Sequence, residues 1–182
     1  MSETWIAVTA VGRDRPSIVA RVTGAMLDLG CNLGETSMAR LRGEFAMILL
    51  VRLSERGDVR EARERLQALG TEMSLTVDVR ELAAEEVEAG DVTDVSYILR
   101  VYGADRPGIV HAVTALLAAR NLNITDLETR VIPGETGPVY VMVLELTAPS
   151  EEAGEAARGE LQELAARMLI EVSYDRLDEE AL

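Results

Sequence analysis

The chain is poor in the side chains that most often carry chemistry or cross-link a fold. Its 182 residues include one cysteine, Cys31, and one histidine, His111. A disulfide within the chain, a cysteine-based zinc site and a His-Glu-x-x-His zinc site are therefore excluded. The remaining carboxylates form no acid–base–nucleophile set. The sequence thus indicates a protein that is not an enzyme, with no cofactor and no metal.

Positive charge is also scarce. The chain has no lysine, and its 18 arginines face 32 acidic residues, for a net charge of −14. Such a surface repels nucleic-acid phosphates and anionic lipid headgroups, so direct nucleic-acid or membrane binding is not expected. Aromatic residues make up only 3% of the chain, which argues against the base-stacking platform of an RNA-binding domain.

Long apolar runs are missing as well. The longest strong run, residues 45–51, is far shorter than a membrane span. No positive segment followed by an apolar stretch begins the chain, so no signal peptide is expected. Together with the single cysteine, these features predict a soluble cytoplasmic protein.

What the chain does have is an internal repeat. Residues 12–19 read GRDRPSIV, and residues 103–110, 91 positions later, read GADRPGIV. The match continues to Asn32 and Asn123, after which the second copy is four residues longer near residues 133–137, a turn-rich hairpin tip. This period has the length of a small domain, so the sequence predicts two copies of one fold.

Each copy shows the same order of elements. The expected elements of the first are a strand over 6–11, a helix over 18–29, strands over 33–42 and 44–53, a helix over 59–69 and a strand over 73–79. Gly30 and Gly70 are the expected helix ends, and Asn121 takes the place of Gly30 in the second copy. A two-residue turn at Arg42-Gly43 joins the middle strands. This β-α-β-β-α-β order predicts two tandem ferredoxin-like domains of the α+β class, each an antiparallel sheet with its helices on one face.

The predicted division follows the repeat. It gives a first domain over 1–81, an acidic and weakly patterned linker over 82–95, a second domain over 96–176 and an acidic tail over 177–182. The sheet faces without helices carry apolar positions such as Ile98 and Tyr102. Exposed apolar faces usually mark interfaces, so we expect the two domains to pack together and the chain to form a homodimer.

The repeated residues resemble the ACT domain. Its pattern of Gly-x-Asp-Arg-Pro-Gly-Ile-Val, a helix and Asn-x-Asn-Ile-x-Asp is nearly complete at residues 103–110 and 121–126. The first copy departs from it, because Ser17 replaces the glycine and residues 32–35 read Asn-Leu-Gly-Glu. The resemblance covers almost the whole chain. Two such copies alone resemble the family of glycine cleavage system transcriptional repressors.

This resemblance implies regulation. ACT domains are similar to one another in binding small ligands, often amino acids, between paired domains, at the loop after the first strand and the start of the second. It implies an amino-acid ligand such as glycine and control of a protein partner such as a DNA-binding regulator. A ligand-free module for protein–protein assembly has the same fold and is the alternative.

The loop of the second copy can also be interpreted without the resemblance. Proline disfavours a helical backbone at Arg106, which places that residue at the N-cap, where arginine cannot accept a hydrogen bond. The amides of Gly108 and Ile109 would then be free at the positive end of a helix dipole, an environment that suits a carboxylate. Asp105 could hold an ammonium group, and Asn123 offers a donor and an acceptor. Alternatively, Asp105 caps the helix and Asn123 only bonds the start of its strand.

The candidate ligand site therefore joins the loop and the start of the following strand in each copy. The second-copy residues are Asp105, Gly108, Ile109, Asn123 and Ile124, and the first-copy residues are Asp14, Ser17, Ile18, Asn32 and Leu33. The second set is favoured, because Gly108 leaves space where Ser17 carries a side chain.

Overall fold

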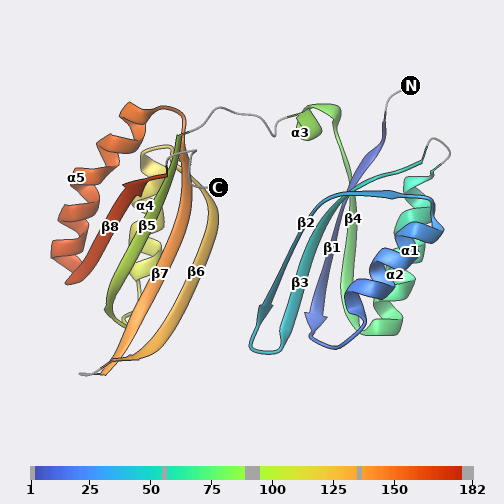
Figure 1. The fold of residues 1–182 in the computed structure, drawn as a ribbon, viewed down its shortest axis with the longest axis horizontal. Helices are drawn as coiled ribbons and strands as arrows, with labels where there is room; N and C mark the ends of the chain where they lie inside the picture. Colours follow the sequence, from blue (N-terminus) through green and yellow to red (C-terminus); the bar gives the residue numbers. More distant parts are fainter. Residues whose placement is uncertain (1–2, 55–56, 89–94, 135–136, 178–182) are drawn as a thin grey trace. The chain divides into compact units, whose positions relative to one another are not determined.

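A computed structural model describes residues 3–54, 57–88, 95–134 and 137–177 (Figure 1). The chain divides into two compact units, Met1–Asp91 and Val92–Leu182. No helix of the described ranges is long and apolar enough to cross a bilayer.

The two units have the same topology. The elements of the first are β1 (Trp5–Arg13), α1 (Ile18–Asp28), β2 (Asn32–Leu41), β3 (Glu44–Arg52), α2 (Val59–Met73), β4 (Leu75–Leu82) and the short α3 (Ala84–Glu88). Those of the second are β5 (Val95–Ala104), α4 (Ile109–Ala119), β6 (Asn123–Gly134), β7 (Gly137–Ala148), α5 (Glu151–Met168) and β8 (Ile170–Arg176). The sheets have the orders β2-β3-β1-β4 and β6-β7-β5-β8, with antiparallel neighbours. The predicted pair of α+β, ferredoxin-like domains is confirmed.

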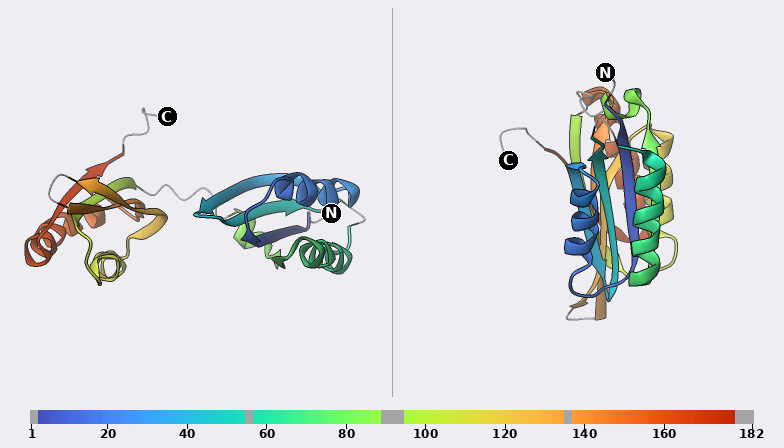
Figure 2. Two further views of the ribbon diagram at one scale, coloured as in Figure 1. Left: turned by 90° about the horizontal axis from the view of Figure 1, so that it is seen from below. Right: turned by 90° about the vertical axis from the view of Figure 1, so that its right-hand side faces the viewer.

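Each core lies between the sheet and its two helices. In the first unit α1 and α2 lie side by side over one face of the sheet (Figures 1 and 2). The alternate residues Ile6, Val8 and Ala10 of β1 point into this layer and are fully buried against residues such as Met26 and Leu66 of the helices. The strand period of two thus gives each sheet one buried face and one face without helices.

The predicted turn and helix ends are largely confirmed. Arg42 and Gly43 join β2 to β3 with φ angles of 55° and 131°, as a two-residue hairpin turn requires. Gly30 (φ 66°) and Asn121 (φ 57°) follow α1 and α4 in the left-handed region. The Leu122 amide donates to the Leu117 carbonyl at 3.0 Å, which closes a Schellman motif.

One predicted helix end was wrong. Gly70 does not end its helix: α2 continues to Met73, and Ser74 (φ 53°) forms the cap. Gly70 is buried, and a Cβ there would lie 2.7 Å from Cγ2 of Val77. The glycine therefore permits close packing of α2 on β4 rather than a stop.

Three large aromatic side chains pack against glycines. The rings of Tyr97 and Tyr174 stack with centroids 4.9 Å apart, and the Tyr174 hydroxyl donates to the Gly154 carbonyl at 3.1 Å. Burial raises the pKa of Tyr174 far above its ordinary value. In the first unit, Trp5 lies over Gly34, where a Cβ would be 2.8 Å from the ring, at a bulge in β2.

The predicted linker and tail are only partly described. Within residues 82–95 the structure shows the end of β4, α3 over Ala84–Glu88 and the first residue of β5. Residues 89–94, and residues 178–182 of the predicted tail, lie outside the described ranges.

Candidate ligand site

The loop after the first strand of each unit ends in a left-handed residue. Gly108 (φ 96°) precedes α4 and Ser17 (φ 77°) precedes α1, and neither helix start has a side-chain cap. The expected N-cap at Arg106 was therefore wrong. Pro107 and Gly108 form a turn, and the positive φ of Gly108 directs the chain into a helix that begins at Ile109.

The shifted helix start changes which amides are free. The first bond within α4 runs from the Ala112 amide to the Gly108 carbonyl. The amides of Ile109, Val110 and His111 thus precede the hydrogen-bonded ladder at the positive end of the helix. The Asp105 carboxylate does not cap them. A Cβ built on Gly108 would meet nothing within 4 Å, so the space beside this residue is open.

The carboxylates of the two loops have different partners. In the first unit Arg40 pairs with Asp14 at 3.4 Å. The position of Arg40 in the second unit is Val131, since each lies opposite the matching residue of the next strand. Among the described residues Asp105 has no ion-pair partner. Burial raises the pKa of Tyr140, and the negative charge of Asp105 adds to this.

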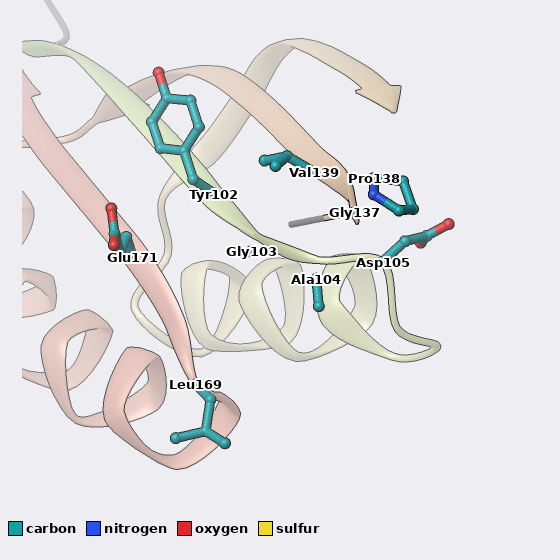
Figure 3. Close-up of a pocket in the computed structure, with 9 residues that line it drawn as sticks. All are labelled: Tyr102, Gly103, Ala104, Asp105, Gly137, Pro138, Val139, Leu169 and Glu171. Atoms are coloured by element: carbon teal, nitrogen blue, oxygen red, sulfur yellow. The ribbon is translucent and has the colours of Figure 1, made fainter. Parts of the chain in front are cut away.

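A pocket of about 510 Å³ lies beside the second loop, within the size range of small-molecule sites. Its lining residues are Tyr102, Gly103, Ala104, Asp105, Gly137, Pro138, Val139, Leu169 and Glu171. Tyr102 and Glu171 extend to the same side of the sheet, and Asp105 stands at the end of β5 (Figure 3).

Only Asp105 of this lining belongs to the predicted site. The sequence did contain a signal for one other part of the pocket lining, the β6–β7 hairpin. The four extra residues of the second copy lengthen the β6–β7 hairpin, and the start of β7 at Gly137 lines the pocket. Glu171 and Leu169 carry no such signal, because they come from the distant β8 and its preceding cap.

The strand-start residues lie at the other end of the sheet. Asn123 pairs with Thr147, which pairs with Ser96 near the start of β5, whereas the Asp105 loop follows Ala104 at its end. Ser96 and Ala104 are eight residues apart along β5, which corresponds to roughly 25 Å. Within one unit, Asn123 and Ile124 are therefore not brought together with Asp105, Gly108 and Ile109.

The first unit has the same separation. Asn32 pairs with Arg52, which pairs with Trp5 at the start of β1, while Asp14 follows the end of that strand. Asn32 and Leu33 thus lie far from Asp14, Ser17 and Ile18. The cause is the topology: two parallel strands joined by one helix begin at the same end of a sheet, and the loop after the first lies at the opposite end.

Other chemistry-bearing residues do not converge on the loops. His111 is exposed on α4, and burial raises the pKa of the Cys31 thiol, which makes it less reactive. Within the described ranges, no group of three or more His, Cys, Asp or Glu residues could hold a metal.

Comparison with known proteins identifies the class of each unit. The ACT-domain family models match residues 4–80 and residues 97–162. The chain therefore belongs to the ACT-domain family, as two ACT domains in tandem.

Two proteins match most of the chain, and a third matches about the length of one domain. It is homologous to the glycine cleavage system transcriptional repressor of Escherichia coli (strain K12), with 29% identity over 156 residues, covering 86% of this chain and 80% of that protein. The UPF0237 protein MK1213 of Methanopyrus kandleri is 40% identical over 78 residues, covering 42% of this chain and 87% of that protein. An unknown protein from Galdieria sulphuraria has a crystal structure with a TM-score of 0.83 at 25% identity, covering 97% of this chain and 100% of that one. The chain is thus an ACT-domain regulatory protein related to the repressor and to the UPF0237 proteins.

Proposed function

We propose that the chain is a non-catalytic cytoplasmic regulator whose second domain binds a small free amino acid and thereby controls a protein partner, such as a DNA-binding regulator. The difference between the two loops supports this. Asp105 lacks the arginine that neutralises Asp14, so it is available to an ammonium group. The open amides that begin α4 suit the carboxylate of the same ligand. Glycine is the first candidate, because one homologue is a glycine cleavage repressor.

The distance between the loop at Asp105 and the strand start at Asn123 limits how one ligand could contact both. A ligand of amino-acid size cannot span the roughly 25 Å between Asp105 and Asn123 within one domain. Contact with both requires a loop from one ACT domain and a strand start from another. The proposed site therefore lies where two ACT domains pair, and the proposal includes a homodimer of the chain.

A ligand-free assembly module remains the second candidate. The observation that favours it is the exposure of apolar side chains on the helix-free face of the first sheet. Val11 is 48% exposed and Ile48 is 53% exposed. Such a face is typical of a protein–protein interface, which requires no small ligand.

Ligand-dependent stabilisation decides between the two. A ligand at one hundred times its dissociation constant stabilises the folded state by about 2.7 kcal/mol, which raises Tm by roughly 5–10 °C for a chain of this size. We expect that shift from glycine or another small amino acid in a thermal-shift screen of the twenty amino acids. Asp105→Asn should abolish it, because the ammonium group loses its counter-charge.

Asp14→Asn is the matched control and should leave the shift unchanged, because Arg40 already occupies Asp14. Asn123→Ala should also reduce the shift if the strand start completes the site. If no amino acid changes Tm at millimolar concentration, the assembly module is the better account. An unchanged shift in Asp105→Asn would place the ligand elsewhere.

A further inference from the structure

One end of the first domain carries arginines without acidic partners. Among the described residues, the exposed arginines that form no ion pair are Arg13, Arg15, Arg42, Arg106 and Arg167. The first three all lie where β1 ends and where β2 turns into β3. Acidic residues outnumber arginines 32 to 18 in the chain, so three unpaired arginines at one place are not a consequence of composition.

Backbone contacts join the loop and the hairpin turn that carry these arginines. The Asp14 amide donates to the Gly43 carbonyl at 2.8 Å, which ties the loop to the hairpin turn. Arg13 lies directly opposite Glu44 in the sheet. The backbone of Arg42 forms an isolated β-bridge with the same residue. We call the set Arg13, Arg15, Arg40 and Arg42 the arginine end.

Negative charge within these loops is insufficient to neutralise the arginine end. Residues 12–17 and 40–44 contain two carboxylates, Asp14 and Glu44. Arg40 pairs with the first of them. The loop and the hairpin turn therefore carry more positive than negative charge in the absence of an anionic partner.

The backbone at Arg42 is also unfavourable for its residue type. Its φ of 55° lies in the left-handed region, which costs free energy for a residue with a Cβ and favours glycine or asparagine. The side chain is exposed, so it repays little of that cost by packing. What arginine contributes at this position is its charge.

The second domain lacks this feature. Ala104 and Val131 occupy the positions of Arg13 and Arg40, and only Arg106 matches Arg15. Arg42 lies in the hairpin turn, where the second copy is four residues longer and Pro133 pairs with Pro138 within the strands. The two copies have thus diverged at the same loop. Within the described ranges, the second presents a carboxylate without an ion-pair partner, and the first presents guanidinium groups.

We propose that the arginine end is a docking surface for a short acidic segment of a protein partner. Guanidinium groups form bidentate hydrogen bonds with carboxylates, which suits them to interface ion pairs. The arginines stand on an exposed loop and turn, which fits an opposing protein surface. A long polyanion such as DNA is disfavoured because the rest of a chain of net charge −14 repels it. This extends the partner control of the proposed function and does not depend on the amino-acid ligand.

Fluorescence anisotropy of a labelled decaglutamate peptide with the full chain tests the proposal at low ionic strength, where surface charges are least screened. The net negative charge of the chain prevents non-specific attraction, so binding reports a local positive site. We expect the triple variant Arg13→Gln, Arg15→Gln, Arg42→Gly to bind at least about tenfold more weakly, since each exposed ion pair contributes modestly. Arg167→Gln removes an unpaired arginine of α5 and should bind like the parent chain.

Arg42→Gly alone separates docking from folding. Glycine adopts the left-handed turn without strain, so this variant should bind the peptide more weakly and melt at a higher temperature. A merely structural Arg42 would instead lower Tm.

The proposal fails if the parent chain does not bind the peptide, or if Arg167→Gln weakens binding as much as the triple variant. It also fails if tripolyphosphate or a DNA duplex binds the arginine end and decaglutamate does not, because the surface then serves phosphates. No free amino acid is present in these peptide titrations. A negative result there therefore leaves the outcome of the thermal-shift screen unaffected.

Discussion

Two glycines of α5 have opposite surroundings although both lie within the same continuous helix. A Cβ on Gly154 would lie 2.3 Å from two ring carbons of Tyr97, whereas a Cβ on Gly159 would meet nothing within 4 Å. Gly154 is therefore needed for the tyrosine to pack, and Gly159 only adds conformational freedom to the unfolded chain.

The two alanine variants should move stability in opposite directions. Gly154→Ala should lower the free energy of unfolding by about 1–3 kcal/mol, because the ring or the helix must shift. Gly159→Ala should raise it by about 0.5–1 kcal/mol, because alanine favours the helix. Urea denaturation followed by far-UV circular dichroism measures both, and a loss of stability in Gly159→Ala would contradict the assigned surroundings.

At the scale of whole elements, the four long helices begin in two different ways. The second helix of each unit has a side-chain cap: the Asp58 carboxylate accepts from the Arg60 amide at 2.8 Å, and the Ser150 hydroxyl accepts from the Ala153 amide at 3.2 Å. The first helix of each unit, α1 or α4, has none. The uncapped starts are the ones at the candidate ligand loops.

Serine substitutions should report this difference. Ser150→Ala should cost about 1 kcal/mol, because it removes a capping bond. Ser17→Ala should cost almost nothing, because it removes no bond, and Ser17→Gly should gain about 1 kcal/mol by relieving the left-handed backbone. Equilibrium urea unfolding measures the three values, and a large cost of Ser17→Ala would show that the hydroxyl has a partner.

Element order was predictable because it depends on periodicity, and some boundaries were not because they depend on packing. The Arg42-Gly43 turn and the Asn121 helix end follow local rules, and both were correct. Gly70 lies within a helix because Val77 packs against it from the next strand. The start of α4 depends on the positive φ of Gly108. No side chain of the loop caps the helix there, so no capping residue in the sequence marks this start.

At the scale of the molecule, the sequence predicted the loop of the candidate site but not its surroundings. Asp105 and Gly108 follow from the repeated motif. The position of Asn123 at the far end of the sheet follows from topology rather than from its closeness along the chain. The pocket that the loop helps to line includes Glu171, more than sixty residues away in the sequence.

We expect the chain to form a homodimer. Under the proposed function, the loop of one domain and the strand start of another meet at the ligand, and half-exposed apolar residues such as Ile48 lie on a helix-free sheet face. Size-exclusion chromatography with light scattering should give twice the 19.8 kDa mass of the chain. An amino acid that binds at paired domains should also increase the dimer fraction, by linkage. A monomer at all micromolar concentrations, with and without ligand, would exclude the dimer.

The aromatic side chains are divided between the two domains in a way that has a practical consequence. Trp5, packed over Gly34, is the only tryptophan, and all four tyrosines follow residue 96. Tryptophan emission, excited at wavelengths that tyrosine does not absorb, therefore reports the first domain alone, without any label or substitution. An event that changes this emission involves the first domain of this duplicated protein, and one that changes only the tyrosine signals involves the second, so both can be followed in a single sample.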